Sequence, residues 1–361
     1  MGVGAIRSMN TAPQSAPAVH ISSQALRTQN DLKGLSLLHR FGWLRAPELG
    51  KLFWPTQEHA SVRVNRLVRS WAERKLVLVR RLPEGAGQAV VLSEAGARLL
   101  RDYADMDAKS GKDWGETRGA MWVPALTWKH DLIATGVLAE LSKRGYEIRT
   151  ERELREAEPK RSAVPDGLAW RQGDTIWVEV EHARKSGPKM RFLALKLSQI
   201  SDPDGAMIAD RRVTTAMVVY RAEGTEDERG FRVDHRSRVS SAISEYAKHP
   251  VQLTWAAYEP AGAGLGAIEL RKDVIYPNPA LALVKRLEWE HTPDTAECSE
   301  SWEAAYNGWL ACIWIEPEHS NQMYWQIEDV DSAIPVDSIS EGKLACAARL
   351  LKLGPRRCEM P

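Results

Sequence analysis

The 361-residue chain lacks several features that define large classes of protein. No run of apolar residues approaches the roughly 18 that a membrane-spanning helix needs. Behind Arg7 the N-terminus has no long apolar stretch of the kind found in secretory signals, so we expect a cytoplasmic protein without membrane contact. The composition, 43% hydrophobic and 27% charged, is ordinary for a globular protein, and the length suits two domains with tails.

Cysteine is also scarce, and its spacing excludes the common zinc modules. The four cysteines all lie in the last quarter of the chain and form no CxxC pair; they are Cys298, Cys312, Cys346 and Cys358. Their intervals match neither a zinc ribbon nor a zinc finger. We therefore expect reduced, partly buried thiols that pack as small hydrophobic side chains.

The formal net charge is only +1, but the charges are distributed unevenly along the chain. Residues 30–101 contain 13 Lys and Arg against 6 Asp and Glu, whereas residues 285–361 contain 7 against 14. A basic N-terminal module and an acidic C-terminal module therefore share one chain. This asymmetry favours nucleic acid as the partner of the basic end, although charge alone does not establish it.

The N-terminal third has a definite order of expected elements. Residues 1–28 are rich in Ala, Ser, Pro and Gln and predict a disordered tail. Apolar spacing predicts a helix from Leu32, a second helix over 46–53 with Pro47 in its first turn, and a longer helix after Pro55 with Thr56 as N-cap. Two strands over 76–81 and 88–93 then form a hairpin around the turn PEGAG, and Ser93 caps a last helix.

Over residues 29–103 this is the element order of a winged helix-turn-helix, in which the third helix enters the major groove of double-stranded DNA. In that helix one face is apolar, through Ala60, Val64, Leu67, Val68 and Trp71. The opposite face carries the residues that we predict to bind DNA, namely Arg63, Asn65, Arg66 and Arg69. The alternative is an ordinary solvated helix surface.

After a polar stretch, expected to be a linker over 104–124, a second domain over 125–284 opens with a helix and contains an informative hairpin. VPDGLAW and TIWVEVEHA are strand-like and are separated by the short turn RQGD. With Gln172 and Gly173 at the centre of the turn, Asp166 lies directly opposite Glu179, and Glu181 points to the same face. The reverse face is apolar and belongs against a core; it carries Ile176, Val178 and Val180.

Three like charges at this spacing destabilise a sheet unless something neutralises them. A hard divalent cation does so through oxygen ligands, so we predict that Asp166, Glu179 and Glu181 bind Mg2+ or Mn2+. The alternative is a solvated edge of a sheet, on which the acids pair with Arg184, Lys185 or Lys189.

The elements around the hairpin resemble a known nuclease core. A helix over 185–200, a Val-rich buried strand over 213–221, a helix over 237–249 and a strand over 251–258 follow the hairpin. The order of helix, three strands, helix and strand resembles the restriction-endonuclease-like fold, known as PD-(D/E)xK. Pro165–Asp166 matches its PD element and Glu179 its second acid, whereas Glu181 stands where that motif usually has lysine. Lys185, Lys189 or Lys196 can supply the missing cation, and we include Lys189 with the three acids as catalytic.

Residues 29–260 together resemble the replication-relaxation family, which includes the MOB-C type mobilisation relaxases of plasmids and integrative elements. The resemblance rests on the winged-helix pattern followed by KHDL, PDG and an ExE strand in that order. It implies an α/β (α+β) protein that nicks an origin-like site with a divalent metal beside other relaxosome proteins, with His130 at a family-like position of open role. The alternative is a winged-helix regulator or relaxosome accessory with a degenerate nuclease fold.

Two questions stay open in the sequence. The nine histidines include no HxH-like cluster of the kind that more familiar relaxases use, and nothing selects among Tyr103, Tyr220 and Tyr246 as a nucleophile. The acidic residues 285–361 lie outside the resemblance and contain two Trp-rich stretches, 306–317 and 323–331, that are expected to form strands of a small module. Its role is either a contact with another protein or an internal cover over the DNA-binding surface.

Overall fold

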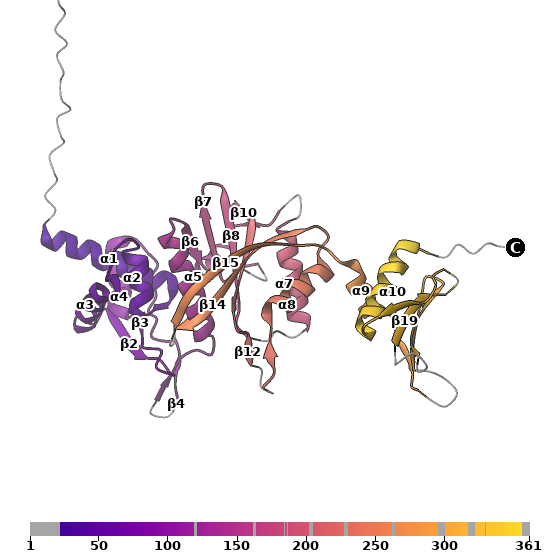
Figure 1. The fold of residues 1–361 in the computed structure, drawn as a ribbon. Coiled ribbons are helices and arrows are strands. Elements are labelled where there is room, and N and C mark those ends of the chain that lie inside the picture. The colour runs from indigo at the N-terminus through magenta and orange to yellow at the C-terminus, as the bar shows by residue number, and fades with distance from the viewer. Residues whose placement is uncertain are drawn as a thin grey trace, which may run out of the picture.

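The computed structural model describes residues 22–355, except 119–120, 162–163, 184, 186, 202–204, 227–229, 262–263, 295–299, 317–321 and 329. The protein is a mixture of helices and sheets, as expected (Figure 1). A group of N-terminal helices, a central sheet and a C-terminal sheet follow one another along the molecule. Within these residues, none of the helices has the length and apolar character to cross a membrane.

The N-terminal module consists of four helices and a three-stranded sheet of order β1-β3-β2. The helices are α1 Ser23–Phe41, α2 Ala46–Phe53, α3 Ala60–Glu73 and α4 Glu94–Ala104, and the strands are β1 Trp43–Leu44, β2 Val77–Arg81 and β3 Gln88–Leu92. The predicted hairpin is confirmed, since β2 and β3 pair from Val77 with Leu92 to Arg81 with Gln88. Ser93 caps α4 as predicted, because its side chain accepts a hydrogen bond from the backbone N–H of Gly96.

Two predicted helix starts in this module were wrong. Helix α1 begins at Ser23 rather than near Leu32, because the Ser22 side chain caps it by accepting a hydrogen bond from the backbone N–H of Ala25. Residues 23–28 of the predicted disordered tail are therefore helical, and residues 1–21 lie outside the described residues. Helix α3 begins at Ala60, so its N-cap is His59 and not Thr56.

The stretch expected to be a linker, residues 104–124, contains ordered structure. It forms an antiparallel pair of strands, β4 Glu116–Arg118 and β5 Met121–Val123. The ring of Trp114 packs between those of Trp43 and Trp122, at centroid distances of 4.6 and 5.3 Å. Aromatic contact thus fixes this stretch against β1 of the N-terminal sheet.

The central sheet has six strands in the order β15-β14-β11-β8-β7-β6. Strands β8, β11 and β14 run parallel, and the others pair antiparallel. Its strands are β6 Glu147–Thr150, β7 Gly167–Arg171, β8 Asp174–Glu181, β11 Thr215–Arg221, β14 Val251–Ala261 and β15 Gly264–Ile275; its helices are α5 Trp128–Lys143, α6 Glu151–Ala157, α7 Gly187–Gln199 and α8 His235–Tyr246. Two short antiparallel pairs join β9 Met207–Ile208 to β10 Arg211–Arg212, and β12 Thr225–Glu226 to β13 Arg232–Val233.

Helices cover both faces of this sheet. On one face α5 and the N-terminal helices share a continuous core with the apolar side of β8, through Ile176, Val178 and Val180, as predicted. On the other face α7 and α8 bury Trp177 of the same strand. Strand β8 also has a paired neighbour on each side, so it is an interior strand and not a solvated edge.

The C-terminal module is an antiparallel sheet with two helices on one face. Its strands follow in the order β16 Glu290–Thr292, β17 Ser301–Tyr306, β18 Trp309–Glu316, β19 Gln322–Ile327 and β20 Ile334–Val336, and its helices are α9 Pro279–Arg286 and α10 Ile339–Leu353. The two expected Trp-rich strands are confirmed as β18 and β19. The boundary placed at residue 284 falls inside α9, because that helix packs its Leu283 into this module's core.

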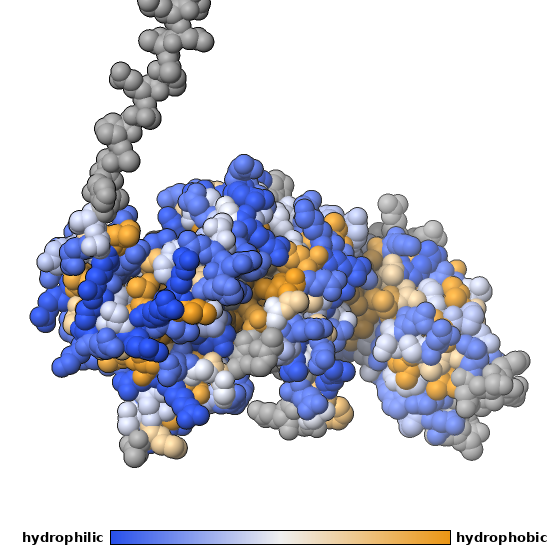
Figure 2. Space-filling view, turned by 60° about the vertical axis from the view of Figure 1, so that its left-hand side comes forward, coloured by the Kyte–Doolittle hydropathy of each residue, from blue (hydrophilic) through white to orange (hydrophobic). Residues whose placement is uncertain are grey.

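The two cysteines among the described residues are free thiols, as expected. Cys346 is buried and Cys312 half-buried, both as free thiols, and burial raises their pKa values to about 12 and about 11. Cys298 and Cys358 lie outside the described residues. The face of the molecule in Figure 2 is mostly hydrophilic, and its hydrophobic patches are separated from one another.

Candidate active site

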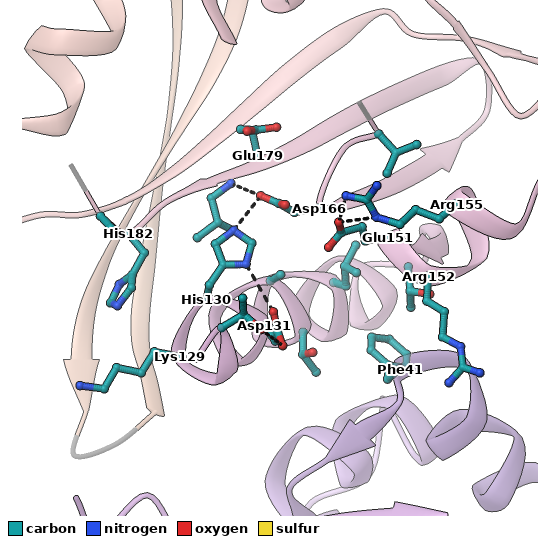
Figure 3. Close-up of a pocket in the computed structure, with 18 of the residues that line it drawn as sticks. Phe41, Lys129, His130, Asp131, Glu151, Arg152, Arg155, Asp166, Glu179 and His182 are labelled. Atoms are coloured by element: carbon teal, nitrogen blue, oxygen red, sulfur yellow. Dashed lines mark hydrogen bonds and ion pairs between the residues drawn. The ribbon is translucent and has the colours of Figure 1, made fainter. Parts of the chain in front are cut away.

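The predicted acids lie at a cleft of about 1300 Å3 where α1, α5, α6, α7 and the end of β8 meet (Figure 3). Phe41 of α1 forms part of the wall, so the N-terminal module borders the cleft. Five lysines and arginines line its rim in addition to Lys185: Lys129, Arg152, Arg155, Lys189 and Lys196. Acids pair with three of these cations: Arg152 with Glu156 and Arg155 with Glu151 in the same lining, and Lys129 with Glu84. Among the described residues, Lys189 and Lys196 of α7 make no such ion pair, so they are the rim cations that suit an anionic ligand.

Asp166 reaches the cleft because the hairpin has the predicted register. Strands β7 and β8 pair from Arg171 with Asp174 to Gly167 with Val178, and Asp166 directly precedes β7. Its Oδ2 accepts a hydrogen bond from the backbone N–H of Val180 at 2.7 Å, which holds the carboxylate beside the end of β8. Only 13% of the side chain is exposed.

Glu179 lies next to this carboxylate and is 12% exposed. Its Oε2 accepts a hydrogen bond from Trp177 Nε1 at 3.1 Å. Burial is the main reason that the pKa of Glu179 is raised, and the negative charge of Asp166 raises it further. The two acids that the resemblance assigns to the PD-(D/E)xK motif are therefore close enough in space to repel each other.

Lys185 places a cation beside both glutamates of β8. It lies in the loop between β8 and α7, and its Nζ is 3.2 Å from Glu179 Oε1 and also contacts Glu181 Oε1. Burial lowers the pKa of Lys185, but the charges of Glu179 and Glu181 outweigh this effect and raise it. The ammonium group is therefore protonated beside the acids.

The structure places Glu181 and Lys189 differently from the predicted catalytic set. Glu181 is 0% exposed and does not line the cleft, and its Oε2 is buried without a hydrogen-bond partner. Burial outweighs the attraction of Lys185 and raises the pKa of Glu181 to about 7. Lys189 lines the cleft from α7 with an exposed side chain, but the lysine that contacts the acids is Lys185.

His130 lies between two carboxylates on the α5 side of the cleft. Its Nε2 is 3.2 Å from Asp166 Oδ2 and its Nδ1 is 3.5 Å from Asp131 Oδ1, as the dashed lines in Figure 3 show. Burial lowers the pKa of His130, but the hydrogen bonds to Asp131 and Asp166 outweigh it and raise the pKa to about 10. The sequence reasoning missed Asp131, and the adjacent His–Asp pair in a predicted helix was the available signal.

The predicted DNA-binding residues occupy one side of α3. Arg63, Asn65, Arg66 and Arg69 are all exposed, while the opposite side buries Ala60, Val64, Val68 and Trp71. Three tyrosines were open as nucleophiles, and the described lining of the cleft contains none of them. Tyr103 is 69% exposed on α4, Tyr220 packs edge-on against Trp255, and Tyr246 lies under the guanidinium of Arg191.

The cleft offers two adjacent carboxylates to a metal ion, so water molecules would have to complete its coordination. In the part of the chain that the structure describes, no three His, Cys, Asp or Glu side chains are grouped so as to hold a metal ion. Asp166 and Glu179 remain as two adjacent carboxylates in the cleft lining. Magnesium binds through one or two carboxylates and keeps several waters, so this pair fits the predicted Mg2+ or Mn2+ without forming a closed cage.

Comparison with known proteins found no match to this chain. No family model matches the sequence, and neither a curated protein nor a solved structure matches the chain.

Proposed function

We propose that this chain binds double-stranded DNA through α3 and cleaves one strand in the cleft with Mg2+ or Mn2+, in the manner of replication-relaxation proteins of mobile elements. One observation carries the proposal: Asp166, Glu179 and Lys185 converge in one cleft, whose rim also carries Lys189 and Lys196. This set resembles the acid, acid and lysine of the PD-(D/E)xK nucleases, with the lysine taken from the loop after the strand.

The order of elements supports the same proposal. Apart from the short helix α6 and the β9–β10 pair, helix α5, strands β6, β7 and β8, helix α7 and strand β11 follow in the order of a restriction-endonuclease-like core. Helices α1 to α4 with the β2–β3 hairpin follow in the order of a winged helix, whose recognition helix would be α3. The exposed polar side of α3 and the cleft would then contact different parts of one DNA molecule.

Each side chain at the cleft has a definite chemical part in this proposal. Asp166 and Glu179 would hold the metal ion, which when bound acts as a Lewis acid on a phosphate oxygen. Lys185 places a positive charge beside Glu179, where it stabilises the negative charge that grows on the phosphate in the transition state. The cations of the rim bind the neighbouring phosphates and set the position of the strand. His130 fixes the carboxylate of Asp166.

A nicking assay tests the proposal. Supercoiled plasmid that carries the DNA flanking the chain's own gene should be relaxed in the presence of Mg2+ or Mn2+ and not in EDTA. Glu179→Gln and Lys185→Met should abolish relaxation, whereas the matched surface variants Glu303→Gln and Lys352→Met should retain it. Activity in Glu179→Gln equal to the wild type would exclude this cleft as the nuclease site.

The second candidate function is a DNA-binding regulator or relaxosome accessory without catalysis. It is favoured by the neutralisation of both acids within the protein, since Lys185 contacts Glu179 and His130 contacts Asp166. Isothermal titration with Mn2+ separates the two functions. The nuclease predicts binding that Asp166→Asn removes, and the regulator predicts no binding that depends on Asp166.

A further inference from the structure

Lys185 is anchored at its backbone as well as at its ammonium group. The backbone carbonyl of Lys185 accepts a hydrogen bond from Arg238 Nη2 at 3.0 Å. Arg238 belongs to α8 and does not line the cleft; its side chain borders a separate groove of about 840 Å3 between α7 and α8. The loop that carries Lys185 is therefore tied to a helix outside the cleft.

The anchor uses a charged group in an unusual way. Arg238 Nη1 is buried and makes no hydrogen bond in the described structure, whereas Nη2 of the same guanidinium donates to the carbonyl of Lys185. Burying an unsatisfied polar atom of a charged group costs free energy that surface arginines avoid. Because Arg238 lies outside the cleft and still bears this unfavourable free energy, we take its hydrogen bond to indicate that the position of Lys185 is under constraint.

Glu181 anchors the other end of the same residue. It is fully buried, contacts the Lys185 ammonium with one oxygen and leaves the other without a partner. Because Glu181 does not line the cleft, it has no direct access to a substrate there. Glu181 belongs to β8, an interior strand, so its position is fixed by the sheet. Its contact with the Lys185 ammonium holds that group near Glu179.

We infer that Arg238 and Glu181 are positioning residues for Lys185: Arg238 fixes the backbone of the loop, and Glu181 fixes the direction of the side chain. The inference rests on the proposed function insofar as Lys185 acts on the phosphate. The placement of Lys185 by two groups outside the cleft can be measured without that reaction. The hydrogen bond from Arg238 to the carbonyl of Lys185 would carry a change at α8 to this lysine.

The test compares Arg238→Met with Arg236→Met, a matched variant on the same helix. Arg236 pairs with Asp273 at 3.1 Å, away from Lys185, and serves as the control for any loss of α8 packing. Acylation of lysines by an amine-reactive reagent, followed by mass spectrometry, reports how often the Lys185 ammonium leaves its carboxylate partners. Loss of a hydrogen bond to a charged group should raise the acylation rate of Lys185 about tenfold or more in Arg238→Met, and leave it unchanged in Arg236→Met.

Nicking supplies a second readout. The Arg238→Met variant should lower kcat about tenfold with little change in KM, because the ground-state contacts of DNA with the rim are intact. Arg238→Lys retains a donor for the carbonyl and should recover part of both readouts, and it replaces Arg238→Met if that variant does not fold. Glu181→Gln should likewise increase the acylation of Lys185.

The outcomes separate this inference from the proposed function. Equal acylation of Lys185 in wild type, Arg238→Met and Glu181→Gln would overturn the positioning role. Increased acylation in both variants, with no nicking by any protein including the wild type, would reject the nuclease and leave the positioning of Lys185 supported. Increased acylation in Arg236→Met equal to that in Arg238→Met would also overturn it, because the effect would then come from α8 as a whole.

Discussion

Replacing Glu181 by glutamine tests the charge state of the buried cluster formed by Glu179, Lys185 and Glu181. Burial raises the pKa of Glu181 from its ordinary 4.5 to about 7, despite the contact with Lys185. A carboxyl group whose pKa is raised in the folded state stabilises the fold fully below pH 4.5. That contribution is lost as the pH rises through about 7. A pKa difference of this size corresponds to about 3 kcal/mol.

Glutamine has nearly the same shape and does not titrate, so it removes this pH dependence. Between about pH 4.5 and about pH 8, the free energy of unfolding of the wild type should fall by about 3 kcal/mol relative to that of Glu181→Gln. Urea unfolding followed by circular dichroism in EDTA, at a series of pH values across this window, measures the difference. EDTA keeps divalent cations from altering the charge of Asp166 and Glu179.

The matched control is Glu303→Gln, which makes the same substitution at an exposed position of β17 in the C-terminal module. Its unfolding free energy should run parallel to that of the wild type at every pH. Parallel curves for wild type and Glu181→Gln would refute the reasoning, because they would mean that folding leaves the proton affinity of Glu181 unchanged. A wild type that gains stability over Glu181→Gln as the pH rises would refute it too, since it would show that the attraction of Lys185 exceeds the cost of burial.

Three further predictions concern other parts of the chain. Asp166→Asn should lower the melting temperature near pH 7, because protonated His130 loses a charged partner. Since the pKa of His130 is raised to about 10, the difference in melting temperature between wild type and variant should shrink as the pH rises through about 10. Mn2+ should raise the melting temperature of the wild type alone. Arg66→Ala should weaken DNA binding and reduce the log–log salt slope by about one in a fluorescence-anisotropy titration, whereas Arg98→Ala on the exposed side of α4 should change neither. Gly34→Ala should cost about 1–3 kcal/mol in urea unfolding, because its new methyl group would overlap the buried Trp71 ring; Gly187→Ala, where a methyl group meets nothing, is the control.

The hairpin of β7 and β8 could be predicted from the sequence in detail. The short turn at Gln172 and Gly173 fixes the pairing, and the alternation of apolar residues fixes which side faces the core. Because both signals are local, the register that brings Asp166 beside Glu179 followed from them. The same holds for α3, where the 3.6-residue period separates exposed arginines from the buried Val64 and Val68.

The layers around β8 could not be predicted from the strand itself. Glutamates at positions 179 and 181 suggest a solvated edge as readily as an interior site, since alternation alone does not report what packs on the polar side. Helix α7 covers that face, and strand β11 pairs with β8 within the sheet. Both contacts depend on how the chain crosses over, which single-sequence patterns do not encode. The extra strand β15 escaped prediction because its exposed residues interrupt the apolar pattern.

The position of Lys185 shows how a lysine outside the strand reaches the carboxylates of Glu179 and Glu181. On β8, the residue two places after Glu179 must face the same side, so a glutamate there puts two carboxylates into one buried region. A cation that reaches both carboxylates stabilises such a pair, and Lys185, four residues after Glu181, contacts both. The acid at position 181 and the lysine at position 185 therefore act as one electrostatic unit, which delivers to Glu179 the same ammonium group that a lysine at 181 would deliver. Beyond that lysine the unit requires a fixed loop, and the hydrogen bond from Arg238 of α8 to the backbone carbonyl of Lys185 meets that requirement.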